Sequence, residues 1–143
     1  MNIRRATTAD FETITGWLAA ARLPVADLSI DDLQHFLLAE SDDDPVGTVG
    51  LEPFDDIGLL RSLVVVPHSQ GSGAGRRLVA ALEAEATRRG MRELWLLTTD
   101  ADAYFTQLGY EVVPRDDAPD CIRQTTEFSK LCPADAILMR KRT

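Results

Sequence analysis

The first apolar positions along the chain follow a helical spacing. Phe11, Ile14 and Leu18 recur three or four residues apart, as on one face of an amphipathic helix. A threonine pair just before this stripe supplies an N-cap. Because the residue before a proline is disfavoured in helical conformation, the predicted helix ends near Arg22, ahead of Pro24.

Shorter apolar runs bounded by turn residues predict strands in the first half of the chain. Ser41–Pro45 is an acidic turn, and Phe54–Asp56 joins two strands in a hairpin. Val25–Asp32 is expected to form a loop with a short second helix. The predicted strands are Asn2–Ala6, His35–Glu40, Val46–Pro53 and Ile57–Val66.

The second half of the chain has a different pattern. Val64–Val66 is a continuous β-branched run, which predicts a strand buried on both faces. A glycine-rich turn then opens a helix with an apolar stripe from Leu78 to Ala86, and Gly90 suits its C-terminal cap. Further along we expect a strand at Leu94–Thr98, a helix at Ala101–Leu108, a strand at Tyr110–Pro114, a loop and helix within Asp117–Phe128, and a last strand at Ala136–Arg140.

This order of elements predicts an α/β (α+β mixed) sheet, antiparallel early and partly parallel later, with helices on both faces. The 143 residues suit one hydrophobic core, and the sequence has no internal repeat or linker. We therefore expect a single domain over residues 1–143.

Composition and charge narrow the function. The net charge is −8, which argues against a nucleic-acid or anionic-membrane partner. The N-terminus lacks the apolar region of a secretory signal, so we expect a cytoplasmic protein whose Cys121 and Cys132 are reduced. His35 and His68 lie far apart and no CxxC pair is present, so no metal is expected.

The most informative segment runs from Leu63 to Gly75, where a strand feeds a glycine-rich turn that starts a helix. The first backbone N–H groups of a helix lack partners and, with the helix dipole, form a site for phosphate groups. No lysine follows the glycines, which excludes a P-loop, and Arg76 stands where a dinucleotide fold needs its third glycine. The alternative is that the glycines only make a tight turn.

This segment resembles the acetyl-CoA signature of GNAT acetyltransferases, Q/R-x-x-G-x-G/A, filled here by Gln70, Gly73 and Gly75. The preceding L-x-V-x-P is filled by Leu63, Val65 and Pro67. Similarity extends to Ile3–Asp10 and to Ala101–Tyr110, so it covers essentially the whole chain. The resemblance implies the GNAT fold and transfer of an acetyl group from acetyl-CoA to an amine.

A narrower resemblance is to a GNAT subgroup encoded in bacterial arsenic-resistance operons. It implies a small amino-acid-like toxin, of the arsenical or phosphinothricin type, as the amine substrate. The segments that carry it are Val49–Glu52, Leu59–Leu63, Leu96–Thr99, Ile122–Arg123, Glu127–Ser129 and Leu131–Pro133.

The resemblance also implies site residues. Backbone N–H groups near Val65 and Val66 would polarise the thioester carbonyl, and the turn amides from Gly71 to Gly75 would hold the pyrophosphate. The expected cofactor-binding set is Leu63, Val64, Val65, Val66, Gln70, Gly71, Ser72, Gly73, Ala74, Gly75, Arg76, Thr99 and Phe105.

The expected catalytic residues are Glu52, Ser62 and Tyr104. Glu52 is either the base, acting through water, or a structural residue, as a solvated carboxylate at the strand end or as an ion-pair partner of Arg61. Many relatives use a tyrosine acid where this sequence has Phe105, and Tyr104 next to it is turned by about 100° on a helix. Tyr104 and Phe105 therefore have core packing as their alternative role.

Two arginines are candidates for binding substrate. Arg61 lies mid-strand and either receives the acid group of an amino-acid-like substrate or forms a structural pair with Glu52. Arg123 is the second candidate, although its i,i+4 spacing to Glu127 also suits a surface ion pair. Cys132, next to Pro133, is interpreted as structural rather than as an arsenic ligand.

Two other functions stay open. The missing tyrosine allows an acetyl-CoA-binding module with weak or no catalysis, and peptide or protein N-acetylation is a further alternative. The resemblance also implies a possible homodimer.

Overall fold

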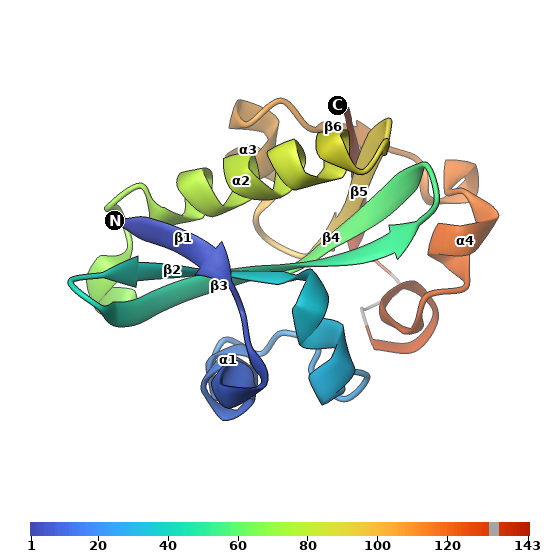
Figure 1. Cartoon of the computed structure of the whole chain (residues 1–143). Helices are drawn as coiled ribbons and strands as arrows, with labels where there is room; N and C mark the ends of the chain where they lie inside the picture. The colour runs from blue at the N-terminus through green and yellow to red at the C-terminus, as the bar shows by residue number, and fades with distance from the viewer. Residues whose placement is uncertain (132–134) are drawn as a thin grey trace.

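The computed structural model describes residues 1–131 and 135–143, which build one seven-stranded sheet with helices on both faces (Figure 1). The strand order is β1-β2-β3-β4-β5-β7-β6. β4 and β5 run parallel, and the other neighbouring strands are antiparallel. The strands are β1 Asn2–Arg5, β2 Phe36–Ser41, β3 Asp44–Phe54, β4 Ile57–Val65, β5 Glu93–Thr98, β6 Glu111–Val113 and β7 Ile137–Arg142.

In the described part of the chain, four α-helices and several single turns connect the strands. The α-helices are α1 Phe11–Ala20, α2 Ala74–Arg88, α3 Asp102–Gln107 and α4 Asp120–Arg123. Short 3₁₀ segments are η1 Thr8–Asp10, η2 Ile30–His35, η3 Pro67–Ser69 and η4 Arg115–Asp117, and η5 Glu127–Leu131 is a π-turn. None of the described helices is long and apolar enough to cross a membrane.

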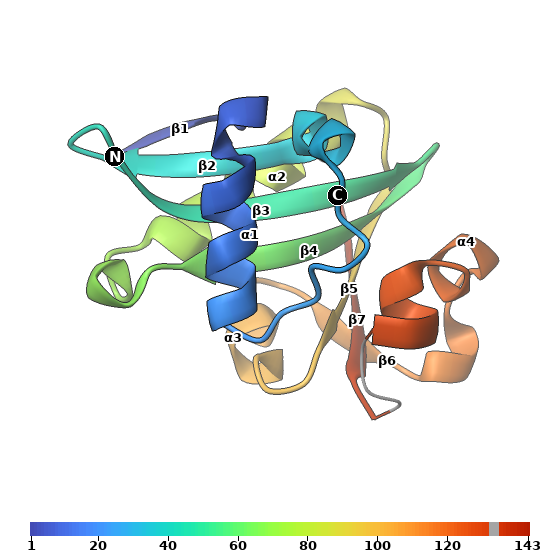
Figure 2. The ribbon, with the colours of Figure 1, turned by 90° about the horizontal axis from the view of Figure 1, so that it is seen from below.

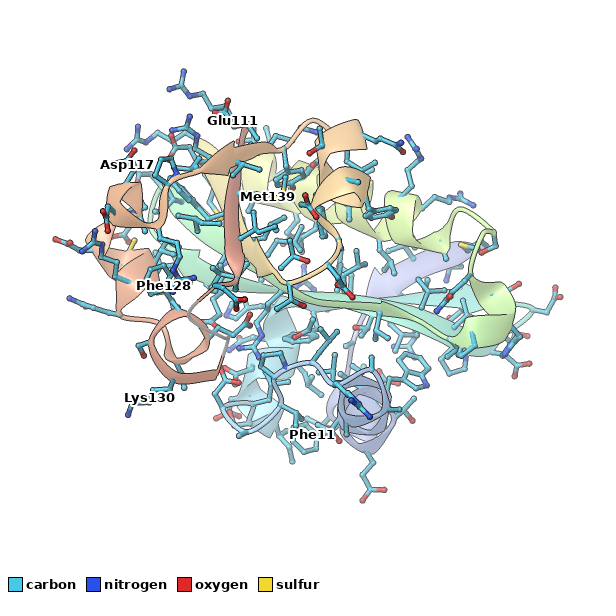
Figure 3. The ribbon with its side chains drawn as sticks, turned by 180° about the vertical axis from the view of Figure 1, so that it is seen from behind. Phe11, Glu111, Asp117, Phe128, Lys130 and Met139 are labelled. Atoms are coloured by element: carbon cyan, nitrogen blue, oxygen red, sulfur yellow. The ribbon has the colours of Figure 1, made fainter. Side chains whose placement is uncertain are left out.

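The two faces of the sheet carry separate cores because side chains alternate along each strand. On β5, Leu94 and Leu96 face α2, whereas Trp95 faces α4. A third cluster joins α1 and η2 to β2 on the side opposite α2. Figure 2 shows α1 crossing β2, β3 and β4. In Figure 3 the segment with Phe128 and Lys130 lies on the same side of the sheet as Phe11 of α1.

The entry to α1 is fixed by one carboxylate. Asp10 accepts a hydrogen bond from the backbone N–H of Thr7 at 2.8 Å, as in a capping box. The same carboxylate binds the guanidinium of Arg4 through two hydrogen bonds of 2.9 and 3.1 Å. These contacts join strand β1 to the start of α1, and all of them are between residues close together in the sequence.

The predicted fold class is confirmed, and each predicted element is found within a few residues of its expected bounds. One expectation is wrong: Val64, Val65 and Val66 are only half-buried. Among the described residues, strands β4 and β5 pair only at their starts, through Ile57–Glu93, Gly58–Leu94 and Leu59–Trp95. The far end of β4 borders an open cleft instead of a neighbouring strand.

Candidate functional site

The candidate site is the cleft where β4 and β5 separate. A cavity of about 230 Å³ lies between them. Its walls are Leu60–Leu63 of β4 and residues 96–100 at the end of β5. The loop after α1 and the helix α3 close it with Arg22, Leu23, Pro24, Tyr104 and Phe105, and Glu127 reaches it from η5.

A β-bulge shapes the β4 wall. Gly50 pairs with Arg61 and Thr48 with Val64, so Ser62 and Leu63 together oppose the single residue Val49. Ser62 has φ +61°, a left-handed conformation that is uncommon for a residue with a Cβ. The bulge bends the strand and turns the backbone after Arg61 at the point where the cleft opens.

The backbone beyond the bulge points alternately to β3 and to the cleft. The N–H of Val66 donates to Val46 O at 2.8 Å, so it faces β3 and cannot polarise a bound carbonyl as expected. Val65, one residue earlier, directs its N–H to the opposite edge, where β5 has diverged. The side chain of Gln70 caps the Val65 carbonyl with a hydrogen bond of 3.1 Å. Val65 therefore supplies the cleft-facing donor.

The glycine-rich turn presents further backbone donors. Gly71 and Gly73 have φ +84° and +89°, and Gly73 is the N-cap of α2. The N–H of Ser72 donates to Ser69 O, and that of Ala74 approaches Ser72 Oγ at 3.4 Å. Within the described parts of the chain, the N–H groups of residues 71, 73, 75 and 76 have no hydrogen-bond partner. Four unpaired donors at one helix start are suited to an anionic oxygen-rich group.

Tyr104 lies against this helix start. Its hydroxyl oxygen is 2.7 Å from where a Cβ on Gly75 would stand, so a larger residue there would displace Tyr104 or the helix start. Burial raises the pKa of the Tyr104 phenol, and the charge of Arg76 opposes this, so the hydroxyl stays protonated at neutral pH. Phe105 is buried and packs edge-on against Tyr104 and Tyr110. Both aromatic rings line the cleft, so their core-packing role is compatible with a place in the site.

The other cofactor candidates divide between the two faces. Leu63, Val65 and Val66 pack against the core under α2, whereas Val64 packs toward α1 on the opposite face. Thr99 lines the cavity at the end of β5, and beside it Thr98 Oγ1 accepts the N–H of Ala101 at 2.9 Å. The side chain of Val64 therefore faces away from the cofactor side of the sheet.

Arg61 is the centre of a buried ionic cluster. Its guanidinium binds both carboxylate oxygens of Asp27, at 2.5 and 2.9 Å, and Glu52 at 2.8 Å. Nε lies 2.9 Å from Glu127 Oε2 and 3.0 Å from Ser62 Oγ. The Arg61 side chain is only 2% exposed. We call Arg61 with these three carboxylates the arginine hub.

The hub explains why an arginine is tolerated in the middle of β4. Burial alone would lower the pKa of Arg61, but the hydrogen bond to Asp27 and the charges of Glu127 and Asp27 raise it above its ordinary value. The guanidinium therefore stays charged and is already saturated with acceptors. The pairing of Arg61 with Glu52 is confirmed. Arg61 also lines the cleft, and its expected role in receiving a substrate acid group stays a prediction.

Glu52 lies on the far side of the hub from the cleft. It lines a second cavity of about 180 Å³ with Asp27, Asp32 and His35, and Arg61 separates that cavity from the cleft. Its side chain is 29% exposed. Any proton that Glu52 takes from the cleft therefore has to pass around the guanidinium.

Arg123 does not reach the cleft. It is exposed and donates hydrogen bonds to the carbonyl oxygens of Ala118 and Asp116, at 3.2 and 2.5 Å. Helix α4 ends at Arg123, so Glu127 is not one turn further along the same helix. The expected ion pair between Arg123 and Glu127 is not formed, because Glu127 turns inward to the hub. Arg123 does not line the cavity, and its substrate-binding role stays a prediction.

Sequence reasoning missed Asp27, the bidentate partner of Arg61, and Arg22 at the mouth of the cleft. An acidic residue within the apolar run Val25–Leu28 was the only signal for Asp27. Cys121 is a free, half-buried thiol, and Cys132 lies outside the described residues. Over residues 1–131 and 135–143, no group of three His, Cys, Asp or Glu side chains could hold a metal ion.

Comparison with known proteins gives three kinds of match. The acetyltransferase (GNAT) family model matches residues 3–110. An amino-acid acetyltransferase of Ralstonia nicotianae is 30% identical over 112 residues, which are 77% of this chain and 24% of that protein. The chain spans about a quarter of the length of such relatives. An N-acetyltransferase of Chlorobaculum tepidum is 27% identical, covering 78% of this chain and 73% of its own length.

Two solved structures share the fold. N-acetylglutamate synthase from Neisseria gonorrhoeae, complexed with coenzyme A and N-acetyl-glutamate, has a TM-score of 0.86 at 23% identity, covering 99% of this chain and 34% of its own. A Mycobacterium tuberculosis protein in complex with CoA and NLQ has a TM-score of 0.84 at 20% identity, covering 100% and 99%. At these identities the similarity shows the fold.

Proposed function

This chain belongs to the acetyltransferase (GNAT) family, and from that premise we propose that it moves the acetyl group of acetyl-CoA to the amine of a small molecule. The observation that carries the proposal is the set of backbone donors at the end of β4 and the start of α2, which Tyr104 connects to the cleft. The set consists of the cleft-facing N–H of Val65 and the four unpaired N–H groups at the start of α2.

These donors fit the two polar parts of acetyl-CoA. The unpaired amides of the glycine-rich turn suit the pyrophosphate, which carries negative charge to the positive end of α2. The N–H of Val65 suits the pantetheine chain that leads into the cleft. The bulge at Ser62 and Leu63 turns β4 where the cleft opens, and we assign to main-chain N–H groups near it the stabilisation of the negative charge that the thioester carbonyl develops during attack.

The amine must lose a proton before it attacks the carbonyl carbon. We assign the removal of this proton to Glu52, through water, because Glu52 lies in the cavity behind Arg61. Glu127 lines the cleft itself, so it is the other carboxylate that could take the proton. Loss of either carboxylate also unbalances the hub, so the diagnostic measurement is the pH profile and not the rate alone.

The departing thiolate of CoA needs little assistance. A free thiol has a pKa near 8.5, so the thiolate leaves readily at neutral pH. Tyr104 is protonated and lines the cleft, although its hydroxyl lies against Gly75 at the start of α2. We therefore propose that Tyr104 shapes the channel at the helix start and that the thiolate takes its proton from Tyr104 or from water.

For the substrate, we propose an amino-acid-like amine, including toxins of the phosphinothricin or arsenical type. Full-length relatives named amino-acid acetyltransferases support the amino-acid part of this proposal. The resemblance to the arsenic-resistance subgroup supports the toxin part.

The test is a thiol-release assay with acetyl-CoA and a panel of acceptors. The panel holds phosphinothricin, glutamate, glutamine, their α-carboxamides, simple alkylamines and short peptides. Calorimetric titration with CoA accompanies it. We expect CoA binding and turnover with at least one free amino acid. CoA binding without turnover of any acceptor would instead support a binding module, and turnover of peptides alone would support peptide acetylation.

A further inference from the structure

Two cationic side chains line the cleft, and they are in opposite states. Arg61 is buried and already bound by three carboxylates. Arg22 is exposed at the mouth, and in the described parts of the chain its side chain forms no hydrogen bond or ion pair. Arg22 is therefore the cation of this cleft that remains available to an anionic group.

The backbone that carries Arg22 is held firmly. Arg22 follows the last turn of α1 with φ +59°, and its N–H donates to Ala19 O at 3.1 Å. Leu23 N donates back to Leu18 O at 2.9 Å, which completes a Schellman motif. Two residues on, Pro24 O accepts a hydrogen bond of 3.3 Å from Arg61. The turn is thus tied both to α1 and to the hub.

The identity of the residue at this position does not follow from the turn. Glycine is the residue that a left-handed helix end prefers, because any Cβ there is strained. A positive charge at a helix C-terminus is favourable, but that charge gives no reason for the side chain to line the cleft. The two roles can be separated by experiment because glycine would improve the cap while removing the charge.

The distribution of charge along the cleft suits a zwitterionic ligand. The buried hub carries three carboxylates against one guanidinium, so the interior has an excess of negative charge. Arg22 stands at the exposed end on the α1 side, and the exposed Asp100 lines the opposite wall at the end of β5. An ammonium group is favoured inward and an acid group outward, on the α1 side.

We propose that Arg22 receives the α-carboxylate of the acceptor and so selects amino acids over simple amines. This inference rests on the proposed function. An exposed charge-assisted hydrogen bond of this kind corresponds to about tenfold in KM.

The test compares Arg22→Gly and Arg22→Lys with the parent enzyme on pairs of free amino acids and their α-carboxamides. Arg88→Ala is the control, because Arg88 is an exposed arginine in the last turn of α2 that pairs with Glu85 away from the cleft. We expect Arg22→Gly to raise KM for the free acid about tenfold, with kcat and the KM of the carboxamide little changed. Arg22→Lys should restore part of the loss, and Arg88→Ala should change neither KM.

Two further readouts exclude trivial explanations. The Tm of Arg22→Gly should equal or exceed that of the parent, because the helix cap is relieved. Added salt should raise the KM of the free acid in the parent and not in Arg22→Gly, since an exposed ion pair is screened. Equal changes for acid and carboxamide, or none, overturn the assignment of Arg22. Turnover of carboxamides or simple amines alone also overturns it, and absence of turnover with every acceptor overturns the proposed function itself.

Discussion

The two sides of the cleft present different chemical groups. The side that we propose for the cofactor, the cofactor side, consists of main-chain N–H groups set by a bulge, two left-handed glycines and the start of α2. The side that we propose for the acceptor consists of charged side chains from four separate segments that meet at Arg61. The first side depends on local backbone conformation, whereas the second exists only when the whole chain is folded.

This difference predicts how each side responds to mutation. A backbone donor is lost only when the local conformation changes, so single substitutions there cost modest free energies. A hub of buried charges is cooperative, because removing one partner leaves the others uncompensated. Substitutions on either side of the cleft test this difference. Those in the hub should have the largest effect on the free energy of unfolding.

The largest effect is expected for Arg61→Met. It removes the single positive charge from among three carboxylates, and loss of one partner of a buried ion pair typically costs about 3–5 kcal/mol. Urea denaturation at pH 7 measures the free energy of unfolding. Arg61→Lys keeps the charge but not the fork of donors, so it should lie between the parent and Arg61→Met. A loss below about 1 kcal/mol in Arg61→Met would mean that the hub contributes no more than a surface pair.

The same distinction explains how much was predictable from the sequence. Gly71, Gly73, Gly90 and Gly109 all have positive φ, and each stands at a turn or helix end that its neighbours in sequence announce. The elements and the glycine-rich turn could therefore be predicted from local patterns. The burial of Val64–Val66 could not be predicted from its apolar character. It depends on whether β5 continues alongside β4.

The sequence did not indicate the arginine hub, because its members lie far apart along the chain. Asp27 and Glu127 lie 34 residues before and 66 residues after Arg61 in sequence, and no periodicity connects them. Arg123 and Glu127 have a helical spacing, but α4 ends between them. Side-chain sites assembled from distant loops need the tertiary structure, whereas sites made from one strand, turn and helix do not.

On the cofactor side, the sharpest test is Gly75→Ala. The added Cβ would lie 2.7 Å from the Tyr104 hydroxyl, so either the tyrosine or the start of α2 must move. We expect weaker CoA binding with a stability loss below about 1 kcal/mol, because the added Cβ meets only the tip of Tyr104, whose exposed side chain can turn away. Titration calorimetry with CoA and thermal unfolding measure the two quantities.

A double mutant identifies the cause of that loss. Tyr104→Phe removes only the hydroxyl, so Gly75→Ala combined with Tyr104→Phe should recover at least half of the CoA affinity lost by Gly75→Ala. Additive effects of the two substitutions would show that the contact between residues 75 and 104 is not what excludes a side chain.

A smaller effect on CoA binding is expected from a matched pair of glycine substitutions. Gly73→Ala places a Cβ at φ +89°, which should lower stability by about 1–2 kcal/mol and weaken CoA binding. Gly16→Ala lies in α1, where an added Cβ meets nothing within 4 Å, and should raise stability by about 0.5–1 kcal/mol. Opposite signs in urea denaturation support the role of left-handed glycine, and a stabilising Gly73→Ala would contradict it.

The smallest effect tests a counterpart of the hub whose arginine is more accessible, the pair of Arg4 and Asp10, in which the Arg4 side chain is 32% exposed. The hydrogen bond from Arg4 is the main factor that lowers the pKa of Asp10 below its usual value of 3.8. Because the folded-state pKa is the lower one, this stabilisation is present above about pH 4 and is lost as the pH falls through the folded pKa. Asp10→Asn should therefore cost about 0.5–1 kcal/mol at pH 7, with the difference from the parent closing below about pH 4. Urea denaturation from pH 3 to pH 7 measures it. A difference as large as that of Arg61→Met, or one that stays constant to pH 3, would show that burial is not what separates the hub from an ordinary ion pair.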